Sequence, residues 1–227
     1  MEHFFDTREE ASIAAADCIA TALDRQLGAL RSTSFVVTGG SSPRACYAAL
    51  AKKELAWDRV HVVLSDERWV PPAHKDSNER LIRSSLLIEN AAQAQLHPFF
   101  EFDVDVQDRC TTIADELRVL PSSFAACLLG MGEDGHVASL FTDADNFATG
   151  IDENNNQLCI PIRTVASPHA RISLTISALL KSDEIVLLFF GNSKLEVYEQ
   201  AKLEATMYPV SRLLHQERVP VSVFWAP

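Results

Sequence analysis

The sequence predicts an α/β fold with a mostly parallel sheet and helices on both of its faces. Short apolar runs typical of buried strands alternate along the chain with longer segments of helical periodicity. Such alternation favours right-handed crossovers, which make successive strands parallel and cover the sheet with helices. Glycine-rich or polar loops also follow several of the apolar runs, as in sheets that bind ligands at their strand ends. We therefore expect a single α/β domain over residues 1–227, with a small irregular excursion at 142–170.

The first half of the chain supplies regularly spaced elements. Residues 7–30 place apolar side chains at helical spacing and predict a long amphipathic helix. Residues 35–37 predict a short strand, and 43–55 a second helix with Ser42 as its N-cap and Pro43 at its first position. Further elements are expected as a strand at 60–64 and helices at 77–88 and 104–119.

The second half is richer in strands. Continuous apolar runs predict strands at 124–129, 185–190 and 221–225, and alternation predicts another at 172–175. The loop at 191–194 leads into a helix that ends near Leu203.

Composition limits the class of protein. Of 227 residues, 47% are apolar and 22% charged, which is typical of globular domains. Apolar runs are too short to span a membrane, and the first residues lack the order of a signal peptide. The net charge of −11 argues against nucleic acid or a membrane as a partner. Five widely spaced cysteines, an odd number, predict a reducing, cytoplasmic location.

The most informative motif follows the strand at 124–129. Three glycines at 130, 132 and 135 form a loop that carries Asp134 and His136. A histidine titrates near neutral pH, so it can take a proton from water at the end of a strand where ligands bind. The alternative is a glycine-rich turn with a capping aspartate and a solvated histidine, which this spacing alone does not exclude.

A second loop, at 38–44, has the chemistry of a phosphate site. A strand ends there, two glycines turn the chain, and a helix begins, so free backbone N–H groups point to one place. The segment lacks the lysine of a P-loop and the spacing of a dinucleotide fingerprint, and an ordinary strand–helix turn is the alternative. The residues expected to bind phosphate here are Gly39, Gly40, Ser41, Ser42 and Arg44.

Three cations and an amide complete the expected site. Arg68 presents a fork of donors that suits phosphate or carboxylate, and the adjacent acids either orient that fork or pair with it on the surface. Lys194 lies at the start of a predicted helix, where the helix dipole disfavours a cation unless an anion is bound there. Arg171 is a binding candidate or a surface residue, and Asn78 is a cap residue or a ligand contact. The histidines show no metal-binding spacing, so we expect no metal and no cofactor.

Four strand ends thus carry glycines or functional residues that suit the binding of an anion, at 38–44, 66–71, 130–136 and 191–194. Parallel strands bring such ends to one edge of a sheet. The sequence therefore predicts cations and N–H groups for a phosphate beside one histidine for proton transfer.

These segments, with 76–78 and 171–175, resemble the signatures of the 6-phosphogluconolactonase family in order and spacing, and residues 130–136 are the most specific part. The resemblance implies the fold shared with glucosamine-6-phosphate deaminase and ribose-5-phosphate isomerase. It also implies metal-independent hydrolysis of a small sugar phosphate lactone, 6-phospho-D-glucono-1,5-lactone, in the oxidative pentose phosphate pathway, with His136 as general base. The segments 142–144 and 167–170 depart from the usual pattern, which leaves the loop shape at 142–170 open. Association with the preceding dehydrogenase has no signal in the sequence.

The resemblance and the residue chemistry together give a mechanism. Neutral His136 activates water, Asp134 holds the imidazole, and the cations with the 39–42 amides hold phosphate or carboxylate. One alternative is a glucosamine-6-phosphate deaminase, whose loop continues with a carboxylate where this chain has residues 137–141, without one. Another is a sugar-phosphate sensor without activity, which has little use for Asp134 and His136.

Overall fold

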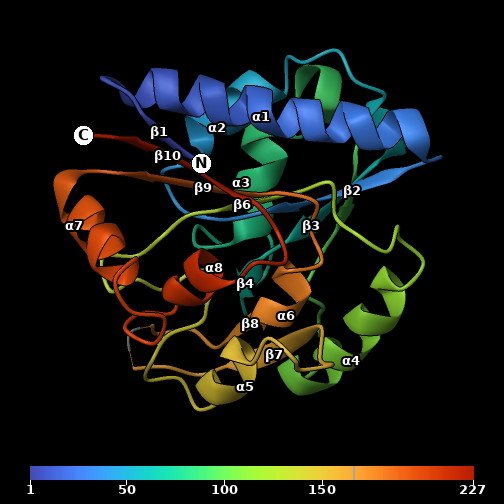
Figure 1. Ribbon diagram of the computed structural model, residues 1–227. Coiled ribbons are helices and arrows are strands. Elements are labelled where there is room, and N and C mark those ends of the chain that lie inside the picture. Colours follow the sequence, from blue (N-terminus) through green and yellow to red (C-terminus); the bar gives the residue numbers. More distant parts are fainter. Residues whose placement is uncertain (166) are drawn as a thin grey trace.

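The computed structural model describes residues 1–165 and 167–227, and the segment 142–170 is described except for residue 166. Its centre is a parallel sheet in the order β1-β10-β9-β6-β2-β3-β5 (Figure 1). The predicted α/β class with a mostly parallel sheet is therefore confirmed. The strands are β1 (Glu2–Phe4), β2 (Thr33–Val37), β3 (Val60–Leu64), β5 (Gln95–His97), β6 (Ala126–Leu129), β9 (Ile185–Phe190) and β10 (Val221–Ala226).

A second, smaller sheet was not predicted. It contains β4 (Asp66–Arg68), β8 (Arg171–Leu174) and β7 (Cys159–Ile162), all antiparallel. Residues 66–68 were expected to be a loop at the end of β3, but the chain turns at Ser65 and pairs with β8, where Arg68 faces Arg171 in the register. The predicted strand at 172–175 exists with a shift of one residue, outside the parallel sheet.

Helices cover the large sheet on both sides. In Figure 1, α1 (Arg8–Ala29) and α2 (Arg44–Leu50) lie on one side, and the small sheet lies on the other with α4 (Val106–Leu117), α5 (Phe147–Ile151) and α6 (Ile176–Leu179). None of the helices in the described part of the chain is both long and apolar enough to cross a membrane. The remaining helices are α3 (Asn78–Ser85), α7 (Asn192–Ala201) and α8 (Ser211–His215), with 3₁₀ turns at Trp57–Arg59 and Glu89–Gln93.

Helix ends show where local chemistry was interpreted correctly and where it was not. Thr7 starts α1 with a capping box, and Ser77 caps α3 through the amide of Arg80. Ser42 does not cap α2: the N-cap is Pro43, which has no side-chain acceptor, and its carbonyl accepts the first helical bond from Tyr47 at 2.8 Å. Helix α2 also ends at Leu50 and not at 55, since the carbonyl of Ala51 accepts from the amide of Ala91 instead.

Buried apolar side chains of both sheets belong to one hydrophobic cluster. Strand β2 lies in the middle of the large sheet and is buried at every position. The carboxyl ends of β2, β6 and β9 are neighbours at one edge, and the small sheet lies beside that edge.

Candidate active site

A cavity opens at this edge, between the carboxyl ends of the parallel strands and the small sheet. It is lined by loops that follow β2 and β6, by Lys194 of α7 and by residues of β4 and β8. Nine of the eleven residues predicted for the site line it, and Asp134 and Arg44 do not. The nine are Gly39, Gly40, Ser41, Ser42, Arg68, Asn78, His136, Arg171 and Lys194.

His136 is held at the cavity by its own loop. Its Nδ1 lies 2.5 Å from Oδ1 of Asp134, and its ring packs on that of Phe141 with centroids 4.2 Å apart. The hydrogen bond from His136 lowers the pKa of Asp134, so this carboxylate is ionised and can only accept. A neutral His136 therefore carries its proton on Nδ1, which leaves the lone pair of Nε2 without a partner among the described residues.

Glycine is required inside this loop. A β-carbon at Gly132 would lie 2.2 Å from Nδ1 of His136 and 2.4 Å from Oδ1 of Asp134. Gly135 has a φ of 74°, and a β-carbon there would lie 2.7 Å from Tyr208. The loop thus packs its backbone directly against the two side chains that it presents.

The loop after β2 presents its backbone to the cavity. Within the described chain, the amides of residues 39–42 donate no hydrogen bond. The hydroxyl of Tyr47 fixes the start of the loop, as it accepts from the Thr38 amide at 2.9 Å and donates to the Thr38 carbonyl at 2.6 Å. Gly40 has a φ of 89°, which suits glycine, and these free N–H groups can bind an anion.

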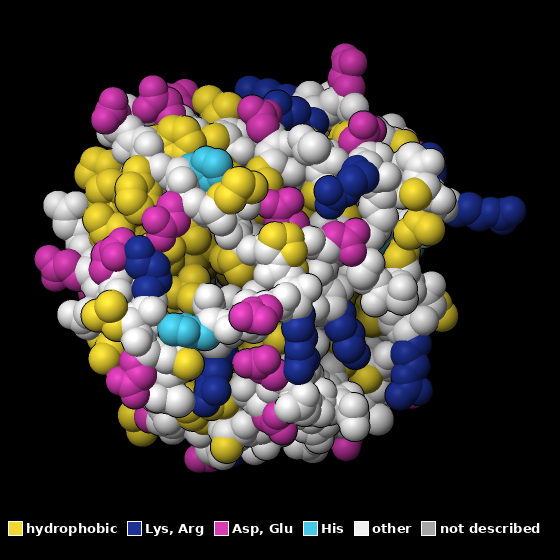
Figure 2. Space-filling model, in the orientation of Figure 1, with side chains coloured by type: hydrophobic (Ala, Val, Ile, Leu, Met, Phe, Trp, Pro, Cys, Tyr) yellow, Lys and Arg dark blue, Asp and Glu magenta, His cyan; other side chains and the backbone are white. Residues whose placement is uncertain are grey.

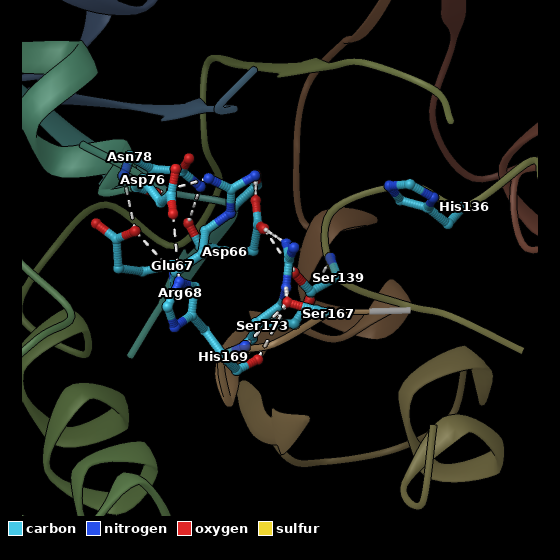
Figure 3. A network of polar contacts seen from close by, with 12 residues as sticks. Asp66, Glu67, Arg68, Asp76, Asn78, His136, Ser139, Ser167, His169 and Ser173 are labelled. Atoms are coloured by element: carbon cyan, nitrogen blue, oxygen red, sulfur yellow. Dashed lines mark hydrogen bonds and ion pairs between the residues drawn. The ribbon is translucent and has the colours of Figure 1, made fainter. Parts of the chain in front are cut away.

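Arg171 belongs to a polar network that the sequence did not reveal. Figure 3 shows this network, with Asp66 and Ser139 labelled. Its Nη1 donates to Oγ of Ser139 at 3.2 Å and lies 3.7 Å from Oδ2 of Asp66. Ser139 in turn donates to the same carboxylate at 2.6 Å. The guanidinium also lies over the ring of Phe141, 5.2 Å from its centroid. Burial lowers the pKa of Arg171, which nevertheless remains charged.

Glu67 and Asp66 are buried, which excludes the alternative that they pair with Arg68 on the surface. Glu67 accepts from the amides of Arg68 at 2.7 Å, Asn78 at 2.7 Å and Glu79 at 2.8 Å. Burial raises its pKa to about 7, against the effect of these donors. These hydrogen bonds connect Glu67 of β4 to the first turn of α3. The connection places Asn78 in the cavity wall.

The guanidinium of Arg68 is held by backbone and not by the acids. Its Nη1 donates to the carbonyl of Asp76 at 2.6 Å, while its Nε is buried without a partner among the described residues. Asn78 donates to the carbonyl of Asp66 at 2.8 Å, and its side chain lies where a β-carbon of Gly39 would stand.

Lys194 and Arg44 differ in position. Lys194 is half-buried and has no hydrogen bond or ion pair with the described residues, and burial lowers the pKa of its ammonium group. Arg44 is exposed and lines two adjoining cavities, one of which also contacts Ser41, Ser42 and Lys194. The sequence grouped Arg44 with the phosphate loop because it is adjacent, but as the first residue of α2 it lines the neighbouring cavities.

The face of the molecule shown in Figure 2 is not uniformly acidic. On the face shown in Figure 2, Lys and Arg side chains are interspersed among Asp and Glu. Three cations, Arg68, Arg171 and Lys194, and the amide side chain of Asn78 line a single cavity, so its local charge differs from the net charge of −11. This arrangement suits an anionic ligand beside a histidine that can accept a proton.

Comparison with known proteins gives one family. The family described as glucosamine-6-phosphate isomerases/6-phosphogluconolactonase matches residues 6–225. The chain is 32% identical to a 6-phosphogluconolactonase of Mesorhizobium japonicum, with 98% of this chain and 94% of that protein covered. The crystal structure of a 6-phosphogluconolactonase from Shewanella baltica is similar with a TM-score of 0.95 and 33% identity, covering 100% of this chain and 97% of the other.

The fold extends to a more distant enzyme. A monomeric glucosamine-6-phosphate deaminase superposes with a TM-score of 0.76 at 18% identity, covering 98% and 96% of the two chains. At this identity the similarity concerns the fold alone, as the sequence resemblance implied.

Proposed function

The chain belongs to the family of glucosamine-6-phosphate isomerases and 6-phosphogluconolactonases, and we infer that it is a 6-phosphogluconolactonase. The reaction is hydrolysis of 6-phospho-D-glucono-1,5-lactone to 6-phosphogluconate in the pentose phosphate pathway. One observation carries the assignment of the site. The unpartnered Nε2 of His136 shares a cavity with the free amides of 39–42 and with three cations.

The proposed reaction begins with neutral His136. Its Nε2 takes a proton from a water molecule whose oxygen attacks C1 of the lactone, and a tetrahedral oxyanion forms. The bond from C1 to the ring oxygen then breaks, and His136 returns the proton to that oxygen. Water is added across the ester bond, and the histidine ends as it began. Asp134 keeps Nδ1 protonated through the contact of 2.5 Å and stabilises the imidazolium in between.

Each charged group of the substrate is assigned to protein groups in the cavity that can still donate a hydrogen bond or offer a positive charge. The phosphate is proposed to bind the amides of 39–42, because they donate to no described residue, with Lys194 and Arg171 as cations. Arg68 is assigned to the developing oxyanion, because its side chain lines the cavity and its guanidinium has donors beyond the one bonded to the carbonyl of Asp76. Asn78 completes the polar wall between these groups.

The segment after His136 argues against the deaminase alternative. Val137, Ala138 and Ser139 follow, and all three are buried. The hydroxyl of Ser139 is hydrogen-bonded to Asp66 and Arg171. None of the three residues has a carboxylate that could act in a ring-opening step. Glucosamine 6-phosphate is therefore expected not to be turned over.

The deciding experiment is hydrolysis of freshly generated 6-phosphogluconolactone, with the spontaneous rate subtracted. His136→Ala should lower kcat by roughly 10²–10⁴-fold, the range for loss of a general base. His215→Ala is the matched control, because that histidine is exposed on α8 and outside the cavity. A loss below about tenfold in His136→Ala removes the general-base role, and binding of the sugar phosphate without turnover by wild type supports a sensor.

Two further properties are proposed on structural support. A single domain over residues 1–227 is supported by the one hydrophobic cluster that joins both sheets. A cytoplasmic location is supported by the cysteines, which are all free thiols, four of them buried.

A further inference from the structure

Two histidines and an aspartate meet beside the candidate active site, on its outer side. His74 and Asp76 lie in the loop between β4 and α3, and His169 lies just before β8. Nε2 of His169 is 3.2 Å from Oδ2 of Asp76, and Nδ1 of His74 is 3.8 Å from the same oxygen. One ligating atom from each residue lies within 4.8 Å of the others. Their spacing in the sequence hid the cluster, because His169 is 93 residues from Asp76.

The distances fit a small tetrahedral ion. Zn²⁺ binds imidazole nitrogen and carboxylate oxygen at about 2.0–2.2 Å, so neighbouring ligand atoms stand roughly 3.3–3.5 Å apart. The two measured distances of 3.2 and 3.8 Å bracket this value. The nitrogens of His74 and His169 lie within 4.8 Å of each other, so side-chain rotation that brings them closer completes the geometry. All three side chains are 28–39% exposed, which leaves room for a water molecule as the fourth ligand.

The backbone that carries the three side chains is fixed from both sides. The amide of Trp69 donates to the carbonyl of Ala170 at 2.8 Å, which joins the two segments next to the cluster. Arg68 donates to the carbonyl of Asp76 at 2.6 Å, and the amide of Asp76 lies 3.2 Å from Nδ1 of His74. This last hydrogen bond, from the amide of Asp76 to Nδ1 of His74, would be given up if that nitrogen bound a metal.

The competing structure is a simple pair in which His169 and Asp76 share a hydrogen bond. That pair does not involve His74, whose ring lies at right angles to that of His169 with centroids 5.3 Å apart and whose Nδ1 accepts from the amide of Asp76. Binding of one ion to all three residues therefore distinguishes the two structures. Lys75 and the guanidinium of Arg68 are nearby cations, so the affinity for a dication is expected to be moderate.

We propose that His74, Asp76 and His169 form a binding site for a divalent transition metal ion, with Zn²⁺ as the best match to the ligands. Two imidazoles and one carboxylate are a common ligand set of four-coordinate zinc with water in the open position. The bound ion joins the loop before α3 to the segment before β8. It therefore reinforces the two strands that carry Arg68 and Arg171 and is separate from the hydrolysis assigned to His136.

The test is titration of the chelator-treated full chain with Zn²⁺ by calorimetry. Wild type should bind one ion, and His74→Ala, His169→Ala and Asp76→Asn should each lower the affinity by at least about tenfold, as much as loss of a supporting group costs. His97→Ala is the matched control, since it disrupts the other close histidine pair, in which Nδ1 of His61 lies 3.0 Å from Nε2 of His97. That variant should bind like wild type.

Two further readouts keep the result clear. Zn²⁺ should raise the Tm of wild type and of His97→Ala but not of the three ligand variants, whose circular dichroism without metal verifies the fold. Co²⁺ should give wild type the visible absorption of a four-coordinate site. Failure of wild type to bind, equal binding by the three variants, or a six-coordinate Co²⁺ spectrum each overturns the proposal and leaves a hydrogen-bonded pair.

Discussion

Two regions meet at the cavity and hold their polar groups in opposite ways. At the edge of the parallel sheet, Lys194, the amides of 39–42 and Nε2 of His136 have no hydrogen-bond partner among the described residues. In the small sheet, Asp66 and Arg171 are buried and bonded through Ser139. The polar groups of the first region are thus open to a ligand, whereas Asp66 and Arg171 in the second are bonded within the protein.

This difference separates binding from stability. A polar group without a protein partner can be removed with little effect on folding, but its loss weakens a ligand. A buried, bonded group stabilises its neighbours, and its removal leaves them unsatisfied. Substitutions in the small sheet should therefore lower both stability and activity, and those at the parallel edge should lower activity alone.

The largest effect is expected for Arg171→Ala. Its side chain is 12% exposed and that of Asp66 is 6% exposed, so the variant leaves an almost buried carboxylate without its cation. The free energy of unfolding should fall by about 3 kcal/mol or more, the usual cost of breaking a buried pair. Urea denaturation measures it, with Asp66→Asn/Arg171→Met as the control that removes both charges. A loss under about 1 kcal/mol means that the network does not hold the small sheet, and the comparison fails.

Glu67 gives the small sheet a predicted pH dependence. Its pKa in the fold is about 7, raised from an ordinary value of 4.5, so the folded chain binds a proton more tightly than the unfolded chain. The contribution of Glu67 to the free energy of unfolding is therefore full below pH 4.5. It is lost as the pH rises through about 7, by up to about 3 kcal/mol. Denaturation from pH 4 to 8 should show this slope in wild type and a flatter one in Glu67→Gln. Equal slopes for wild type and Glu67→Gln mean that the fold does not raise the pKa of the Glu67 carboxyl.

The two regions also differ in how well the sequence predicts them. The loops after β2, β6 and β9 could be predicted because their signals are local: a buried apolar strand, glycines, and a helix start within a few residues. Nine predicted residues line the cavity, and their roles remain predictions until tested. The error at Ser42 has a local cause as well, since a serine before a proline has the pattern of a cap wherever the helix begins.

The small sheet could not be predicted in this way. Strands of three or four residues carry no measurable periodicity, and β4 pairs with β8 about a hundred residues further along. The importance of Asp66 and Ser139 depends on that pairing. One available signal was three ionisable residues placed one residue after a mostly apolar strand, which is unusual for a solvated turn. A network built from long-range contacts can be identified only when the fold is known.

Lys194→Ala should separate binding from stability at the parallel edge. A cation that contacts a bound phosphate contributes about 1.5–3 kcal/mol, so KM should rise roughly 10–100-fold. The free energy of unfolding should change by less than about 0.5 kcal/mol, because the ammonium group has no partner to lose among the described residues. Steady-state kinetics and urea denaturation of the same preparation give both values. A loss of stability as large as that of Arg171→Ala contradicts the distinction between the regions.

The smallest effect is expected for Arg44→Ala, which marks where the parallel edge stops acting on the substrate. Arg44 lies two residues from Ser42 but is exposed and lines the adjoining cavities, not the one that contains His136. A surface cation at this position interacts with the substrate only through solvent, so kcat/KM should fall less than about twofold at physiological salt. Lys194→Ala is the natural comparison, because both cations line the adjoining cavity and only Lys194 lines both. If the two variants raise KM equally, the phosphate lies between the two cavities, and the region open to a ligand extends onto the first turn of α2.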